Sequence, residues 1–159
     1  MWGWGRGWIF LRRGSGGAFS KAAQQIRSLN VSEFTTSLDF GGIDLTLDLA
    51  AEAVVDGVLL GLYQYTPFKT VDRESIREIS GFTILDGEES AVKTIRNAVK
   101  TAEIIAGAVL FARDIVSTPA NEMTPTDLAN EAKTSAKGKN IQCRVLGTEI
   151  GRASCRERV

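Results

Sequence analysis

Residues 88–117 read EESAVKTIRNAVKTAEIIAGAVLFARDIVS, and this stretch decides how the rest of the chain is organised. Its apolar residues recur alternately every four and every three positions, as on one face of an α-helix: Ala91, Ile95, Ala98, Ala102, Ile105, Val109, Ala112 and Val116. We therefore predict one helix over residues 88–117, roughly 45 Å long. Because the stripe is rich in alanine and has no leucine, a buried helix or a bridge between domains is favoured over a free-standing coiled coil.

The sequence before this helix alternates helical and extended patterns. Apolar spacing predicts helices over residues 17–29 and 48–62, while alternating apolar residues predict strands at residues 34–40 and 79–85. Gly57 lies four residues before Gly61 in the second helix, where each glycine lowers helix propensity by about 1 kcal/mol. We expect that helix to pack closely against another element. Helices and strands in alternation predict an α/β fold.

The residues after the long helix predict a turn and a new helix start. Pro119 is expected to end the long helix, and Asn121 is expected to organise the turn through its amide. Thr124 is a suitable N-cap, with Pro125 in the first helical position and Asp127 reaching back in a capping box.

This new helix should be followed by a strand. We expect the helix to end near Lys137, with Gly138 in the left-handed conformation. Ile141, Cys143 and Val145 then alternate as in a strand, which would make Cys143 a small core residue.

Composition excludes several classes of protein. The 159 residues include 19 Lys and Arg, 19 Asp and Glu, and no His, which rules out His-based triads and His-containing zinc sites. Two cysteines cannot form a disulfide scaffold. The longest apolar run, residues 104–112, is far too short for a membrane span. Zero net charge gives no reason to expect a nucleic acid or an anionic membrane as a partner.

The two ends of the chain differ from its middle. Residues 1–13 contain three arginines, no acidic residue and no helical or strand period, and we expect them to be an unstructured, non-native start. Residues 150–159 contain three more arginines and one acidic residue, and they resemble the translation of a common sequencing adapter. We therefore expect this tail to be adapter-derived, the chain to be a fragment, and its body to be acidic.

Residues 113–125, RDIVSTPANEMTP, resemble the R-D-L-V-N-x-P-A-N-x-x-x-P segment of the leucyl (cytosol) aminopeptidase family, with Ser117 where the family usually has Asn. Residues 56–65, DGVLLGLYQY, are similar to that family's E-G-x-x-L-x-x-Y-x-F helix end. The resemblance extends over residues 17–149. It implies three parts: the C-terminal part of a macro-like N-terminal domain (residues 14–87), a long connecting helix (88–117), and the first helix and strand of a catalytic domain (118–149).

The resemblance also implies an activity. Members of the family are cytoplasmic aminopeptidases that hold two divalent ions, manganese or zinc, act on peptides and assemble as homo-hexamers. Their catalytic and metal-binding residues lie in the motifs G-K-G-x-x-F-D-S-G-G and N-T-D-A-E-G-R, and neither motif occurs in this sequence. We therefore expect the chain to contain no catalytic, cofactor-binding or metal-binding residue, to bind neither ion and to be inactive by itself.

The charged residues that are present suggest no replacement for that centre. The acidic groups Glu88 and Glu89, Asp72 and Glu74, and Asp44 and Asp48 lack clustered partners and are expected to face solvent. Adjacent on a helix, Arg113 and Asp114 do not face each other, so we expect them to anchor the N-terminal domain or the following loop.

An alternative function is a stand-alone macro-like binding or assembly module. Against it, residues 124–145 would leave apolar edges uncovered, and an acidic body disfavours DNA.

Overall fold

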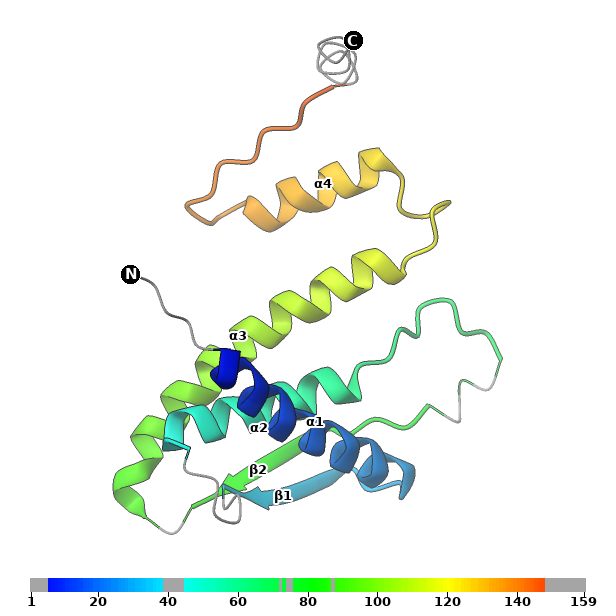
Figure 1. Cartoon of the computed structure of the whole chain (residues 1–159). Coiled ribbons are helices and arrows are strands. Elements are labelled where there is room, and N and C mark those ends of the chain that lie inside the picture. Colours follow the sequence, from blue (N-terminus) through cyan, green and yellow to red (C-terminus); the bar gives the residue numbers. More distant parts are fainter. Residues whose placement is uncertain (1–5, 39–44, 72, 74–75, 87, 148–159) are drawn as a thin grey trace. The chain divides into compact units, whose positions relative to one another are not determined.

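The computed structural model describes residues 6–38, 45–71, 73, 76–86 and 88–147 (Figure 1). Its contacts divide the chain into two units, one ending at Arg113 and the other beginning at Asp114. The elements, in chain order, are α1 (Arg6–Ser28), β1 (Glu33–Ser37), α2 (Leu47–Leu62), β2 (Gly81–Leu85), the 3₁₀ turn η2 (Glu89–Ala91), α3 (Val92–Ser117) and α4 (Pro125–Ala136).

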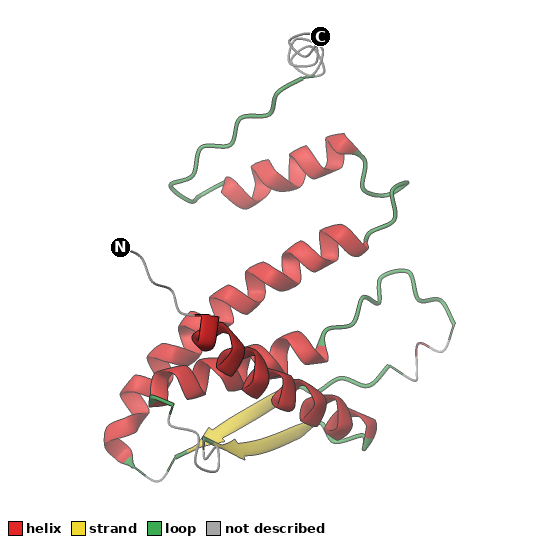
Figure 2. Ribbon diagram, in the orientation of Figure 1, coloured by secondary structure: helices red, strands yellow, loops and turns green. Residues whose placement is uncertain are grey.

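Figure 2 shows that most of the described chain is helical. No helix within the described ranges combines the length and hydropathy that a membrane span requires.

In the described part of the chain, the sheet consists of β1 and β2, which run parallel. They are joined through α2, as a parallel pair requires a crossover connection. Phe34 lies opposite Phe82 in the register, and the two rings stack with centroids 5.6 Å apart. This face packs on the helices, whereas Thr35 and its register partner Thr83 are exposed on the other face. The α/β prediction is confirmed; β1 ends at Ser37 and β2 begins at Gly81, two residues later than predicted, while residues 39–40 of the first predicted strand lie outside the described residues.

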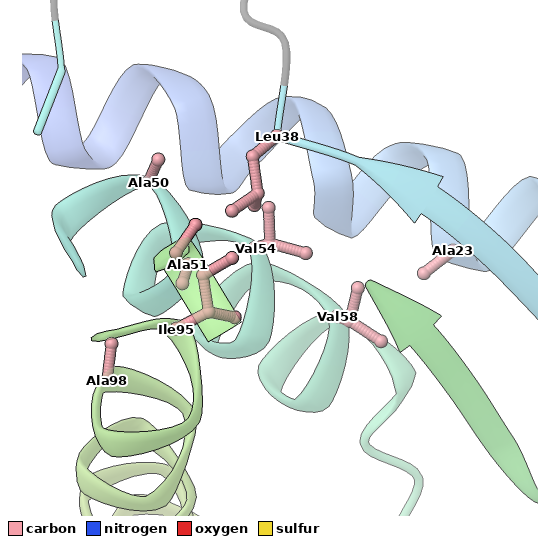
Figure 3. Close-up of a cluster of buried hydrophobic side chains, with 9 residues drawn as sticks. Ala23, Leu38, Ala50, Ala51, Val54, Val58, Ile95 and Ala98 are labelled. Atoms are coloured by element: carbon pink, nitrogen blue, oxygen red, sulfur yellow. The ribbon is translucent and has the colours of Figure 1, made fainter. Parts of the chain in front are cut away.

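The core of the first unit is built from small and β-branched side chains. Val54, Val55 and Val58 of α2 are its largest fully buried residues. Around α2, α1 contributes Ala23 and the start of α3 contributes Ile95 and Ala98 (Figure 3). Because these side chains are small, the helices can approach one another closely.

The close approach of α1 and α2 depends on two glycines, as the sequence predicted. A Cβ atom on Gly57 would lie 2.5 Å from the carbonyl oxygen of Gly16 and 2.9 Å from Cβ of Phe19. A Cβ atom on Gly61 would collide with Ser20. The loss of helix propensity at both positions therefore makes room for the neighbouring helix.

The helix α1 begins much earlier than predicted. It starts at Arg6, so the expectation that residues 1–13 lack regular structure is wrong from that residue onward. The apolar and arginine residues between positions 8 and 13 tolerate helical geometry. Once residues 17–28 are helical, each added residue gains a hydrogen bond without a new nucleation cost. Asn30, with φ of 62°, adopts the left-handed conformation shortly after the helix ends.

The long helix is confirmed, preceded by the short 3₁₀ turn. The first half of its predicted apolar stripe is buried, from Ala91 through Ala102. Farther along, Ile105 is 44% exposed and Val116 is 85% exposed. The periodicity therefore located the helix correctly, but within this chain only the N-terminal half of the stripe is covered.

The second unit contains α4 and the segment after it. Gly138 has φ of 76°, the left-handed conformation predicted for it. The predicted strand at residues 141–145 is wrong, because residues 141–147 form no regular structure. Cys143 is exposed instead of lying in a core. A strand needs a hydrogen-bonding neighbour, and no described residue pairs with this segment.

Candidate functional site

The segment that begins at Arg113 is held to α2 at its first residue. Nη1 of Arg113 donates a hydrogen bond to the carbonyl oxygen of Leu60 at 2.9 Å. The guanidinium carbon also lies 5.5 Å from the centre of the Tyr63 ring, within range of a cation–π interaction. The prediction that Arg113 anchors the N-terminal part of the chain is confirmed.

Asp114 has a different role from its neighbour. Its backbone carbonyl accepts hydrogen bonds from the amide and the hydroxyl of Thr118, at 3.0 and 2.7 Å. Arg113 thus holds α2, while the backbone of Asp114 holds the start of the following turn. The Arg113 contacts agree with the predicted anchoring role, whereas the bonds to Asp114 involve only its backbone carbonyl, so an anchoring role of its side chain stays a prediction.

The turn before α4 is closed mainly by the backbone. The amides of Glu122 and Met123 both donate to the carbonyl oxygen of Pro119 at 2.9 Å. Asn121 lies in the turn, as predicted, and its side-chain amide donates to Oε1 of Glu122 at 3.3 Å. The position of Asn121 is therefore confirmed, while the bonds that close the turn converge on Pro119.

The capping box at the start of α4 is confirmed. The hydroxyl of Thr124 accepts a hydrogen bond from the Asp127 amide at 3.3 Å, and Oδ2 of Asp127 accepts one from the Thr124 amide at 3.1 Å. The Thr124 hydroxyl also donates to Oδ2 of Asp127. These bonds lower the pKa of Asp127 below its ordinary value of 3.8, the Thr124 side chain having the largest effect and the Thr124 amide the next.

The lowered pKa predicts that α4 frays in acid. The charged carboxylate of Asp127 stabilises the helix at pH values above 3.8, and this stabilisation is lost as the pH falls through the lower, folded-state pKa. Amide exchange and Cα chemical shifts of Leu128 and Ala129, measured between neutral pH and strong acid, should report the loss. Asp127→Asn should show frayed values already at neutral pH. Glu131→Gln, which removes a carboxylate outside the capping box, should behave like the wild type; equal behaviour of the two variants would contradict the prediction.

The other predicted acidic groups are not gathered into a centre by the described structure. Asp48 lies at the start of α2, where the Thr46 side chain and then the Leu49 amide lower its pKa. Glu88 accepts a hydrogen bond from the hydroxyl of Ser90, and Glu89 is exposed. Asp44, Asp72 and Glu74 lie outside the described residues.

Among the residues that the structure describes, no three Cys, Asp or Glu side chains are grouped so that they could hold a metal ion. The positions of the carboxylates, the side chains that would bind such ions, also argue against a metal centre. A two-metal hydrolytic centre needs several carboxylates converging on one space, and the carboxylates of Asp48, Glu88 and Asp127 are instead bonded at separate turns and helix starts. The described residues do not fit such a centre.

A polar hollow of about 190 Å³ lies beside the C-terminal end of α2, lined in part by Arg27, Gln64 and Arg77. Arg27 donates to the carbonyl oxygen of Leu62 at 3.1 Å, and Arg77 donates to that of Ser28 at 2.6 Å. Gln64 donates to the carbonyl oxygen of Arg77 at 3.2 Å. These side chains fasten segments together. The sequence analysis missed them, because no spacing relates residues that are 35 and 49 positions apart.

A larger and more apolar hollow, of about 540 Å³, lies between β2 and the first turns of α3. We call it the β2 groove. Its walls include Phe82, Ile84 and Leu85 from β2, and Ile95 and Val99 from α3. Charged residues also line it: Asp86, which follows β2, and Arg96 and Glu103 of α3. It is suited to an extended apolar segment more than to a small polar ligand.

Comparison with known proteins finds that the chain is similar in sequence to part of several probable cytosol aminopeptidases. No protein-family model matches it. It is 36% identical over 100 residues to the probable cytosol aminopeptidase of Nitratidesulfovibrio vulgaris (62% of this chain and 20% of the relative). The probable cytosol aminopeptidase of Xanthobacter autotrophicus is 32% identical over 126 residues, which cover 79% of this chain and 24% of the relative. The probable cytosol aminopeptidase of Syntrophobacter fumaroxidans is 31% identical over 134 residues, which cover 84% of this chain and 26% of the relative. The chain thus spans about a fifth to a quarter of the length of these relatives.

Solved structures share the fold. A structure of the bottromycin maturation enzyme BotP aligns with a TM-score of 0.68 and 21% identity, over 89% of this chain and 29% of that one. A second structure, described as BotP in complex with Mn, aligns with a TM-score of 0.60 and 22% identity, over 77% of this chain and 24% of that one. At this level of identity the likeness concerns the fold alone.

Proposed function

The chain is related in sequence to a segment of the cytosol aminopeptidases, and from this premise we propose that it is the part of such an enzyme that leads into the catalytic domain. In this proposal, residues 14–87 are the end of a macro-like N-terminal domain and residues 88–117 the connecting helix. Residues 118–149 then begin the catalytic domain. The whole enzyme would remove N-terminal residues from peptides in the cytoplasm and assemble as a homo-hexamer.

One observation carries the proposal. The contacts of the structure divide the chain between Arg113 and Asp114. The segment that resembles the start of the family's catalytic domain begins at the same place, with Arg113 itself. Arg113 is bonded back to Leu60 on the N-terminal side, and the turn and capped helix that follow belong to the second unit. The family-like segment and the second unit thus begin next to each other near the C-terminal end of α3, which supports a change of domain close to the proposed start at residue 118.

We further propose that the chain by itself hydrolyses no peptide. In a whole enzyme of this kind, two manganese or zinc ions would act as Lewis acids on the scissile carbonyl and on a water molecule. The described residues of this chain do not fit such a centre, and the family's two ligand-bearing motifs are absent from its sequence. What the chain contributes is the anchored helix and the start of the domain on which a catalytic centre would be built.

Two measurements test these proposals, the first of them the inactivity of the isolated chain. The purified chain should give no turnover of leucine p-nitroanilide above the buffer rate, with or without added manganese or zinc, while the Xanthobacter relative serves as the positive control. Appreciable turnover that follows the chain through purification would refute its inactivity.

The second measurement tests the family role directly. Residues 17–147 would replace the matching segment of the Xanthobacter enzyme, and we expect the chimera to keep peptidase activity. A chimera that folds and assembles like its parent but has lost activity would count against the proposed role, and a stand-alone module would then be the better description.

A further inference from the structure

The C-terminal end of α2 lacks the left-handed glycine with which many helices end. The last carbonyl groups of a helix have no amide partner within it, and such a glycine commonly folds the chain back to satisfy them. The residue that follows α2 is Tyr63, with φ of −54° and ψ of 130°, so the chain leaves the helix in an extended conformation. The carbonyl groups of residues 60–62 therefore need donors from elsewhere.

Side chains from two other helices supply these donors, two of them from α1 and one from α3. Three consecutive carbonyl oxygens each accept a hydrogen bond from a different side chain: Leu60 from Nη1 of Arg113 at 2.9 Å, Gly61 from Nε2 of Gln24 at 3.0 Å, and Leu62 from Nη1 of Arg27 at 3.1 Å. We call these three donors the α2 cap. The end of α2 is thus closed by residues that are distant from it in the sequence.

The charge of the α2 cap suits its position. The C-terminal end of a helix carries a partial negative charge, which the guanidinium groups of Arg27 and Arg113 offset. The guanidinium carbon of Arg113 also lies 5.5 Å from the centre of the ring of Tyr63, at the same end of the helix. Arg113 therefore makes two contacts with the end of α2, both of them through its cationic side chain.

Arg113 lies beyond the buried part of α3. The last buried residue of this helix is Ala106, and Arg113 follows it by about two turns, on the same face. Arg113 is also the last residue of the first unit. Its bond to Leu60 therefore holds α3 to the first unit at a point where the burial of small apolar side chains has already ended.

We propose that Arg113 is a positioning residue of the enzyme: by completing the α2 cap, it holds the later turns of α3 at the end of α2, directly before the second unit begins. This inference rests on the proposed function, in which the second unit leads into the catalytic domain. Without Arg113, the two donors from α1 would still cap α2, but the hold on α3 beyond Ala106 would weaken. The turns between Ala106 and Arg113 would then open more often.

The first test is hydrogen exchange of the full chain, compared segment by segment. Arg113→Ala should speed exchange at residues 107–113 and at the end of α2 by at least about threefold, as expected for the loss of one modest hydrogen bond. The matched control is Arg27→Ala, which removes the same kind of bond from Leu62. It should speed exchange at the end of α2 and leave residues 107–113 as in the wild type. Arg113→Lys, which keeps a cation and a donor, should restore slow exchange.

The second test uses the chimera described above, in which residues 17–147 come from this chain. Arg113→Ala should lower its kcat by at least about threefold, because less definite geometry at the entry to the catalytic domain misplaces the reacting groups. Arg27→Ala should leave kcat unchanged, and Arg113→Lys should recover it. A general loss of stability would instead lower the activity of both alanine variants alike.

Four results would overturn the proposal: unchanged exchange at residues 107–113 in Arg113→Ala, equal exchange there in the two alanine variants, no recovery in Arg113→Lys, or an Arg113→Ala chimera as active as the parent chimera. Circular dichroism checks that each variant is folded. Hydrogen exchange involves no peptidase activity, whereas the proposed function is judged by the activity of the parent chimera. The two proposals can therefore fail separately.

Discussion

Gly57→Ala should lower the free energy of unfolding by about 2 kcal/mol, although alanine is the better helix former. The added Cβ atom would lie 2.5 Å from the Gly16 carbonyl oxygen and 3.1 Å from the Gly16 Cα atom. Both are backbone atoms, which cannot move aside by a change of rotamer. The helices α1 and α2 would have to separate, and contacts along their whole interface would weaken. Urea unfolding followed by circular dichroism measures the effect.

The control for this prediction is Gly107→Ala in α3. A Cβ atom there would meet nothing within 4 Å. The substitution should therefore raise stability by roughly 0.5–1 kcal/mol, the intrinsic difference between the two residues in a helix. The two variants make the same chemical change in a helix and are expected to shift stability in opposite directions. If Gly57→Ala stabilised the chain as Gly107→Ala does, the close packing of α1 on α2 would be wrong.

The features predicted successfully from sequence are those that depend on neighbours along the chain. Helical spacing located α3, because one face of a helix repeats within a few residues. The capping box of Thr124 and Asp127 was found for the same reason, since both partners lie within one turn. The left-handed conformation of Gly138 follows from the end of a helix and also needs no distant partner.

The features that sequence missed depend on residues far apart. The bonds from Arg27 to Leu62 and from Arg77 to Ser28 join long side chains to backbone carbonyls, and any carbonyl could have accepted them. The predicted strand at residues 141–145 had the right alternation, but a strand forms only beside another strand. Sequence alternation describes a face and gives no information on whether a neighbour exists.

The candidate site contains features of both kinds, local ones that the sequence predicted and contacts between distant residues that it did not. The resemblance at residues 113–125 led us to expect a new domain from residue 118, and the contacts divide the chain after Arg113, within the last turns of α3. The anchoring role of Arg113 followed from helix geometry, because adjacent residues on a helix point in different directions. Its partners, the Leu60 carbonyl and the Tyr63 ring, could not be named in advance, since they depend on how α3 crosses α2.

Val54→Asp should have a still larger effect, lowering the free energy of unfolding by more than about 4 kcal/mol. Val54 is fully buried at the centre of α2, within the cluster that joins α1, the sheet and α3. A carboxylate there would have to remain charged without water or take up a proton, and either choice destabilises the folded state. Since domains of this size have only about 5–15 kcal/mol of stability, a large part of the first unit should unfold.

Val71→Asp is the matched control, because Val71 is 75% exposed in the loop between α2 and β2. The same chemical change should alter stability there by no more than about 0.5 kcal/mol. Val54→Ala provides an intermediate step of about 2 kcal/mol, because it removes buried carbon atoms without adding a polar group. Urea unfolding should show a free energy of unfolding that falls in steps, least for Val71→Asp, more for Val54→Ala and most for Val54→Asp. That order would identify Val54 as the centre of the core. Similar midpoints for both aspartate variants would instead place the core elsewhere.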